Sequence, residues 1–193
     1  MLATKKYISL LRGINVGGNR KILMADLKAL YARLGFRNAV TYIQSGNVVF
    51  ETDADNDADA EIATISTKIE AAILETFGFE VPVVVFTSDT LLRITNENPF
   101  LKTAESTPVE KLHVTFLSEI PTPDRIEKAN IAAHSLKTGS DAFHIIGSAA
   151  YISCEKYNET KFSNAFFEKQ LGVKATTRNW KTVLQLVATT QPY

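Results

Sequence analysis

Hydrophobic residues recur with two different periods in the first half of the chain, and these periods predict its elements. Short apolar runs predict strands at residues 6–11 and 80–86, and a hairpin with strands 40–44 and 47–50 joined by Ser45 and Gly46. Apolar residues at helical spacing predict helices over 24–34, 62–77 and 88–96, and Gly35 and Gly78 end the first two. The predicted order of elements is βαββαβα.

The second half repeats this order without repeating the residues. Strands are predicted at 111–117 and 173–177, with a hairpin of 142–146 and 149–154 across Gly147-Ser148. Helices are predicted over 124–136, from 160–163 to Gly172, and over 180–188. Each half therefore predicts a ferredoxin-like βαββαβ unit, in which helices cover an antiparallel sheet.

These patterns place the chain in the α+β class with two halves. Residues 1–95 form the first predicted subdomain, 96–110 a linker with the turn-forming Asn98-Pro99-Phe100 and Thr107-Pro108, and 111–193 the second subdomain. A single continuous α+β domain is the alternative that the pattern leaves open.

Composition narrows the environment and the partners. The 193 residues include 21 Lys+Arg and 21 Asp+Glu, and this zero net charge disfavours general nucleic-acid binding. Cys154 is the only cysteine, so an intrachain disulfide is excluded and a reducing compartment is expected. Without a secretory leader pattern or an apolar run of about 20 residues, we expect a cytoplasmic protein with no membrane partner.

The glycine-rich segment at residues 10–21 (LLRGINVGGNRK) is the strongest candidate for chemistry. Gly13 and Gly18 have the spacing of a P-loop, but Asn19 and Arg20 stand where its lysine and its Ser/Thr are required. A nucleoside triphosphatase of that type is therefore not expected. Two interpretations remain equally open: an anion-binding nest of backbone N–H groups, or a plain turn that needs glycine.

Further cations and amides border other predicted turns and helix starts. Arginine matches the geometry of phosphate and carboxylate groups, and helix N-termini attract anions. If the loops converge, they form an oxyanion or phosphate pocket in a cleft between the halves; alternatively, Arg12 and Arg178 pair with acidic residues across the domain interface. The candidate ligand-binding residues are Arg12, Asn15, Gly17, Gly18, Ser45, Asn47, Lys161, Asn164, Arg178 and Asn179.

Other reactive residue types give weaker signals. His113, His134 and His144 match no zinc spacing, so no metal site is expected. Alternation in the second hairpin sends His144 and Cys154 to opposite faces, which makes Cys154 a small structural hydrophobe rather than a nucleophile. None of the candidate ligand-binding residues has the features of a general base, so catalysis is not implied, and the sequence leaves the cofactor unknown. An enzyme built this way would act through electrostatic stabilisation of a transferring group.

Two further segments are interpreted structurally. The acidic run Asp53–Glu61 has Ala58 and Thr64 where a calcium loop needs Gly and Glu, so it is taken as a lead-in to the second helix. Trp180 begins the closing helix and is expected to be a buried anchor.

Five segments of the chain resemble motifs of a known family. They are residues 10–18 (LLRGINVGG), 42–50 (YIQSGNVVF), 98–100 (NPF), 160–164 (TKFSN) and 177–180 (TRNW), and they resemble motifs of the bacterial domain of unknown function family 1697. The resemblance implies a cytoplasmic α+β protein with ferredoxin-like halves, and no established activity. The cations, amides and glycines in the predicted turns make small-anion binding the leading functional hypothesis, with a nucleic-acid-binding module and a dimerising interaction protein as alternatives.

Overall fold

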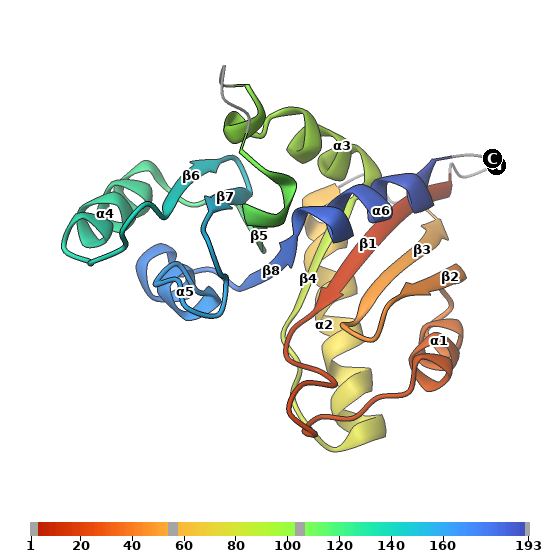
Figure 1. The fold of residues 1–193 in the computed structure, drawn as a ribbon. Coiled ribbons are helices and arrows are strands. Elements are labelled where there is room, and N and C mark those ends of the chain that lie inside the picture. The colour runs from red at the N-terminus through yellow and green to blue at the C-terminus, as the bar shows by residue number, and fades with distance from the viewer. Residues whose placement is uncertain (1–3, 54–57, 103–106, 192–193) are drawn as a thin grey trace. The chain divides into compact units, whose positions relative to one another are not determined.

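The first half of the chain forms one sheet and three helices in the computed structural model, which describes residues 4–53, 58–102 and 107–191 (Figure 1). The elements are β1 (Thr4–Leu11), α1 (Met24–Arg33), β2 (Arg37–Tyr42), β3 (Asn47–Asp53), α2 (Ala58–Phe77), β4 (Val83–Thr87) and α3 (Ser88–Asn96). The four strands lie in the order β2-β3-β1-β4, and all neighbouring strands are antiparallel.

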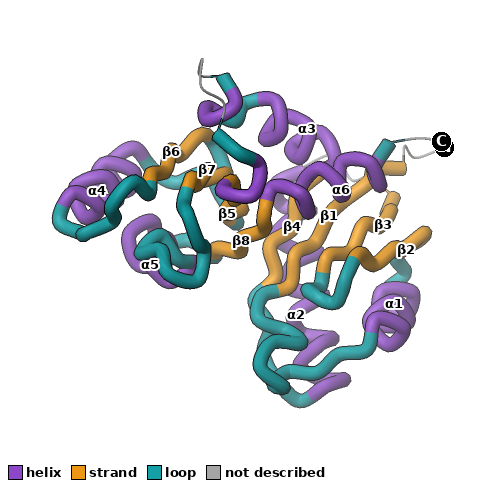
Figure 2. The backbone as a smooth tube through the Cα atoms, viewed as in Figure 1, coloured by secondary structure: helices purple, strands orange, loops and turns teal. Residues whose placement is uncertain are grey.

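The second half has the same arrangement. Two short 3-10 helices, η1 (Pro99–Leu101) and η2 (Val109–Lys111), precede β5 (Leu112–Leu117), α4 (Pro123–His134), β6 (Ala142–Ile146), β7 (Ala149–Ser153), α5 (Asn164–Leu171), β8 (Ala175–Asn179) and α6 (Trp180–Thr190). Its sheet has the order β6-β7-β5-β8 and is also antiparallel. Figure 2 shows these strands in orange. The described residues thus form two four-stranded antiparallel sheets and six α-helices, which confirms the α+β class.

The chain divides into two units. Unit 1 is Met1–Leu91 with Leu186–Tyr193, and unit 2 is Leu92–Gln185. In this division Leu91 and Leu92 of α3 belong to different units, and the last turn of α6 groups with unit 1. Within unit 1, the Lys6 ammonium donates to the carbonyl of Thr190 at 3.1 Å, which ties this last turn to β1.

The core of unit 1 lies between one face of its sheet and the helices α1 and α2. Tyr7, Phe50 and Val85 from the strands pack in one cluster with Tyr31 of α1 and Ile69 of α2. The Tyr31 hydroxyl lies 2.6 Å from Ser9 Oγ, so this buried phenol is satisfied. The apolar residues whose spacing predicted these two helices are the residues that the helices turn toward the core.

The core of unit 2 lies on the face of its sheet that is covered by α4 and α5. Ala150 and Ile152 of β7 pack with Phe167 and Leu171 of α5 and with Cys154. Gly172 ends α5 in the left-handed conformation, with φ 76°, which confirms that it is the C-terminal stop of this helix. Trp180 is buried, in agreement with its prediction as an anchor.

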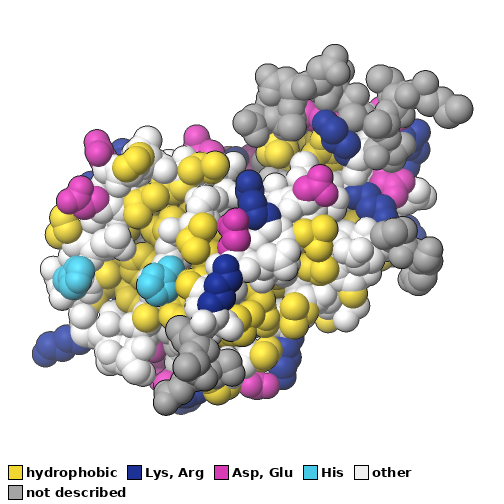
Figure 3. Space-filling model, turned by 90° about the horizontal axis from the view of Figure 1, so that it is seen from above, with side chains coloured by type: hydrophobic (Ala, Val, Ile, Leu, Met, Phe, Trp, Pro, Cys, Tyr) yellow, Lys and Arg dark blue, Asp and Glu magenta, His cyan; other side chains and the backbone are white. Residues whose placement is uncertain are grey.

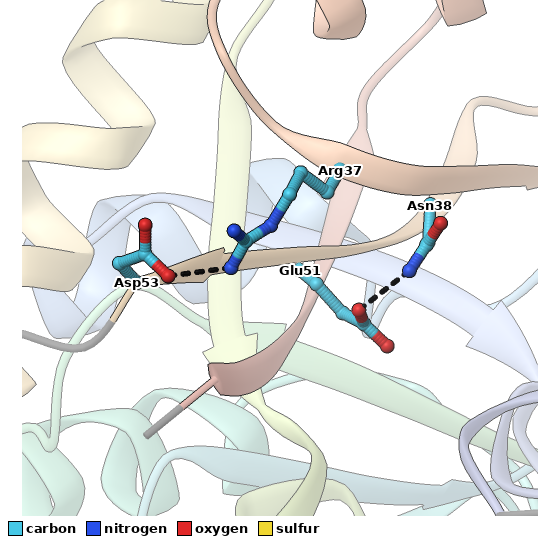
Figure 4. Close-up of polar contacts among 4 residues, drawn as sticks. All are labelled: Arg37, Asn38, Glu51 and Asp53. Carbon is cyan, nitrogen blue, oxygen red and sulfur yellow. Dashed lines mark hydrogen bonds and ion pairs between the residues drawn. The ribbon is translucent and has the colours of Figure 1, made fainter. Parts of the chain in front are cut away.

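The free edge of β2 is irregular. The register between β2 and β3 shifts between Arg37 and Val40, and Asn38 has φ 51°. Both polar side chains fold onto acids of β3: Arg37 pairs with Asp53, and Asn38 Nδ2 donates to Glu51 Oε2 at 2.7 Å (Figure 4). A bulge and charged pairs of this kind oppose pairing with a further strand.

The acidic lead-in of the sequence lies partly outside the described residues. Residues 54–57 are among those that the structure does not describe, and α2 begins after them at Ala58.

Candidate functional site

The loop between β1 and α1 is the least regular backbone of unit 1. Five of its residues have positive φ: Gly13 (71°), Asn15 (56°), Gly17 (60°), Gly18 (79°) and Arg20 (48°). Three are glycines, for which this region is accessible at no steric cost, but Asn15 and Arg20 adopt it with side chains attached. Such positions are retained when the surrounding contacts determine them, and they are frequent at functional sites.

The glycine pair forms the tip of a small hairpin. Val16 and Asn19 form an antiparallel bridge, in which the Asn19 N–H donates to the Val16 carbonyl at 3.2 Å. Positive φ at both intervening glycines is the requirement of a type I′ turn. Four further residues, 20–23, then precede α1, and its N-cap Leu23 makes no side-chain capping bond. The tip glycines therefore lie at an exposed hairpin and not at the helix start.

A single side chain fixes the base of this hairpin. Asn15 Nδ2 donates to the carbonyls of Ile22 and Gln44, both at 2.9 Å, and its Oδ1 accepts from the Ile22 N–H at 2.9 Å. The Asn15 carboxamide thus joins both ends of the loop to the turn between β2 and β3. These bonds occupy its donors, so Asn15 acts in this structure as a support for the loop.

The turn between β2 and β3 has four residues, so the predicted two-residue turn is wrong. Tyr42 pairs directly with Asn47, which leaves residues 43–46 as the connection. Ile43 and Gly46 have φ of 50° and 75°, and the Gly46 carbonyl accepts from the Leu11 N–H at 2.8 Å. Composition alone did not reveal the longer turn because it uses positive φ at an isoleucine, where that conformation is rare.

Ser45 and Asn47 lie beside this turn and bond to each other. Asn47 is fully buried, and its Nδ2 donates to the Tyr42 carbonyl and to Ser45 Oγ, both at 2.9 Å. Unit 1 therefore brings together six of the predicted residues at the end of β1: Arg12, Asn15, Gly17, Gly18, Ser45 and Asn47. Within this group, Asn47 is placed to hold the turn.

Two cations of the loop reach solvent. Arg20 and Lys21 are exposed, and neither makes an ion pair among the described residues. The Arg20 guanidinium lies over Gly13, because a Cβ on that glycine would be 3.5 Å from Arg20 Nη1. No carboxylate occurs between Arg12 and Ala25, so every charged side chain that this loop itself contributes is positive.

Backbone donors lie next to these cations. The N–H groups of Gly17 and Gly18 have no backbone acceptor among the described residues, and both glycines are exposed. Two amide donors beside two exposed cations form an arrangement that can bind an oxyanion. Of the six residues in unit 1, Gly17 and Gly18 are the best placed to contact a ligand.

The four predicted residues of unit 2 have separate roles. Asn164 Oδ1 accepts from Thr177 Oγ1 at 2.7 Å at the start of α5, and Asn179 Oδ1 caps α6 by accepting from the Thr182 N–H at 2.8 Å. Lys161 is exposed on the segment before α5. The structure therefore joins Asn164 to β8, next to Arg178, and gives Asn179 a capping role.

Arg178 is held close to its own strand. Its Nη1 donates to the Thr177 carbonyl at 2.8 Å. Burial lowers the pKa of the guanidinium to about 10, and the proximity of the Tyr157 phenol opposes that shift. The group remains a cation at neutral pH.

Cys154 has a histidine neighbour that sequence reasoning did not find. Its Sγ lies 3.8 Å from His113 Nδ1, and the His113 ring stacks on Tyr157 with centroids 4.9 Å apart. Burial lowers the pKa of His113, so the imidazole is neutral at pH 7 and supplies no positive charge to the sulfur. The predicted role of Cys154 as a buried hydrophobe agrees with its place in the core.

We expect Cys154 to resist alkylation until the solution is strongly alkaline. Burial, with smaller contributions from Asp141 and Glu155, raises the pKa of its thiol from 9.0 to about 11. At pH 8 this leaves about 100-fold less thiolate than in an unfolded chain. Stability is unaffected below pH 9 and falls as the pH rises from 9 toward 11, because the unfolded chain releases this proton first. Iodoacetamide rates against pH measure the shift; a folded-state midpoint at or below pH 9 would contradict it.

Unit 2 also contains a cavity. A cavity of about 310 Å³ in unit 2 is lined by Thr107, Pro108, Lys111, Ser140, Ser153, Cys154 and Glu155. Lys111 and Glu155 form an ion pair with each other there. Across the part of the chain that the structure describes, no group of three or more His, Cys, Asp or Glu side chains is arranged to hold a metal ion. Within the same residues, no helix has the length and apolar character to cross a bilayer.

Comparison with known proteins identifies the family. Residues 4–151 match the family described as "Protein of unknown function (DUF1697)", which covers most of the chain. The chain belongs to the DUF1697 family. This confirms the family that the glycine-rich and SGN-containing motifs resemble.

One solved structure supports the fold of this DUF1697 chain. It is similar, with a TM-score of 0.69, to a conserved bacterial protein from Streptococcus pneumoniae; the sequences are 21% identical, and the match covers 96% of this chain and 98% of that one. No curated protein matches the sequence.

The geometry favours two residues that are absent from the candidate ligand-binding residues predicted from the sequence. These are Arg20 and Lys21, at the end of the glycine-rich segment. The signal that identifies them is the absence of any acidic residue between positions 12 and 25, combined with their position directly after a Gly-Gly turn. Their exposure is a tertiary property and required the structure.

Proposed function

We propose that this protein binds a small phosphate-bearing anion at the hairpin loop of unit 1. The ligand's oxygens would accept hydrogen bonds from the backbone of Gly17 and Gly18 and pair with Arg20 and Lys21. The observation that carries the proposal is the pair of exposed cations without ion-pair partners among the described residues, next to open amide donors on a backbone fixed in strained conformations.

The rigidity of the loop supports this assignment. Asn15 and Gly46 hold the base of the hairpin before any ligand arrives. Binding groups that are ordered in advance lose less conformational entropy when a ligand binds. Arg12 belongs to the same loop, and we propose that it adds positive charge from its half-buried position.

The alternative of a nucleic-acid-binding module has less support. In the face drawn in Figure 3, cationic and anionic side chains are interspersed rather than gathered by sign. The exposed tip Val16–Lys21 also has no aromatic residue on which a base could stack. The alternative of a dimer that pairs along the β2 edge is disfavoured by the bulge and polar pairs of that edge.

The proposal predicts that phosphate moves the amide signals of the loop glycines. In ¹⁵N–¹H NMR titrations with inorganic phosphate and tripolyphosphate, we expect saturable shifts at Gly17 and Gly18. The double variant Arg20→Ala/Lys21→Ala should weaken binding about 100-fold, because each charge-assisted contact contributes roughly 1.5 kcal/mol.

A variant of equal charge provides the control. Lys128→Ala/Lys169→Ala removes two exposed cations from helices of unit 2, and it should leave the affinity unchanged. Glycine signals that do not respond to either anion, or an equal loss of affinity in the two double variants, would overturn the proposal. Tighter binding of single-stranded RNA than of tripolyphosphate, with a steep salt dependence, would instead favour the nucleic-acid alternative.

A further inference from the structure

Three exposed aliphatic residues belong to the loop that carries the proposed anion site and to the β2–β3 turn bonded to it. Val16, Leu23 and Ile43 are 66%, 71% and 49% exposed. Each is adjacent in sequence to a residue of the Asn15 hydrogen-bond network, since Val16 follows Asn15 itself, Leu23 follows Ile22 and Ile43 precedes Gln44. The bonds that fix the loop therefore hold all three aliphatic residues at the same end of unit 1.

The backbone at Ile43 indicates that this arrangement has more than a packing role. A β-branched residue with φ 50° is conformationally strained, and the exposed Ile43 side chain gains little from core packing in return. Single exposed hydrophobic residues need no explanation, but here three of them lie next to residues of one hydrogen-bonded junction. Strain kept at an exposed position favours a binding role.

The charge of the loop and of residues 37–50, around the β2–β3 turn, favours a negatively charged ligand. Neither residues 12–25 nor residues 37–50 contain a carboxylate, while Arg20 and Lys21 stand exposed between Val16 and Leu23 in the chain. A ligand bound here therefore meets cations and amide donors together with aliphatic surface. The side chains of Val16, Leu23 and Ile43 match a saturated hydrocarbon better than the flat face of a base, for which aromatic residues are preferred.

We infer that the phosphate of the ligand is attached to an aliphatic chain, as in an alkyl or acyl phosphate. This inference rests on the proposed function. The phosphate contacts Gly17, Gly18, Arg20 and Lys21. The hydrocarbon covers Val16, Leu23 and Ile43 and removes them from water.

A series of linear alkyl phosphates tests this inference. Affinities for inorganic, methyl, butyl and hexyl phosphate are measured from the Gly17 and Gly18 amide shifts, at concentrations where the ligand signals show no self-association. We expect affinity to rise about two- to four-fold for each methylene group, which is the gain from burying it. The variant Val16→Ser/Leu23→Ser should lose this dependence on chain length.

A control of the same size is available in unit 2. Ile120→Ser/Ile131→Ser replaces two exposed aliphatic residues there and should retain the dependence on chain length. Equal affinities along the series would overturn the inference while leaving phosphate binding, and so the proposed function, intact. Mononucleotides that bind more tightly than hexyl phosphate would also overturn it. A lack of binding by every member, inorganic phosphate included, would instead remove the proposed function itself.

Discussion

Replacement of Gly46 by alanine is expected to destabilise unit 1 by about 3 kcal/mol. A Cβ at this position would lie 2.6 Å from Leu11 Cβ and 2.8 Å from Ile14 Cδ1, closer than side-chain carbons can approach. Gly46 also has φ 75°, where an L-residue adds roughly 1 to 2 kcal/mol of strain. Overpacking in a filled core adds a further 1 to 3 kcal/mol, because both contacts are with buried residues of the core.

Gly78→Ala is the matched control for Gly46→Ala. Gly78 has φ 77°, but no atom lies within 4 Å of the added Cβ, so only the backbone strain of about 1 kcal/mol remains. Urea denaturation followed by far-UV circular dichroism measures both free energies of unfolding, and amide exchange at Leu11 reports on the contact itself. Equal losses of unfolding free energy in the two variants would show that close contacts with Leu11 and Ile14 add nothing to the cost of a Cβ at Gly46.

Asn15→Ala is expected to lower the free energy of unfolding by about 2 to 3 kcal/mol. The substitution removes three hydrogen bonds at 2.9 Å, each worth roughly 1 kcal/mol net, and leaves the backbone groups of Ile22 and Gln44 to find water. Alanine also keeps the strain of φ 56°. We expect the amides of the hairpin loop to exchange faster with solvent in this variant.

Asn15→Gly separates the two causes. Glycine loses the same side-chain bonds but adopts φ 56° without strain, so it should be roughly 0.5 to 1 kcal/mol less damaging than alanine. Denaturation of both variants under the same conditions gives this difference. If the glycine variant were as stable as the original protein, the Asn15 hydrogen bonds would contribute no more than the backbone strain that glycine relieves, and the expected loss of about 2 to 3 kcal/mol would be wrong.

Most elements could be predicted because local physics dominates them. The helix at Ser88–Asn96 and the start of the last helix at Trp180 agree with the prediction, and the two-residue turn at Gly147-Ser148 is confirmed by the pairing of Ile146 with Ala149. Strand ends were less accurate: β4 begins at Val83 rather than residue 80, and β8 spans Ala175–Asn179 rather than 173–177. Strand ends depend on partners that are distant in the sequence.

The position of the candidate site could be predicted from the sequence, but the roles of its individual residues could not. The glycine-rich segment was identified because Gly-Gly followed by two cations is a local pattern. Asn15 in that segment and Asn47 beside the predicted hairpin turn were also predicted to bind a ligand, whereas their amides bond within the protein. An amide side chain serves a ligand and a buried carbonyl with the same chemistry, so residue type alone does not separate the two uses.

The sequence by itself determined the α+β class, the repeated order of elements, the family and the position of the glycine-rich loop. Periodicity and turn residues act over a few positions, and that is sufficient for these properties. Only the tertiary structure decided that Asn15 joins the loop to Gln44, that Gly46 packs against Leu11, and that His113 rather than His144 lies beside Cys154. Each of these is a contact between segments more than 25 residues apart, and such contacts are set by how strands pair.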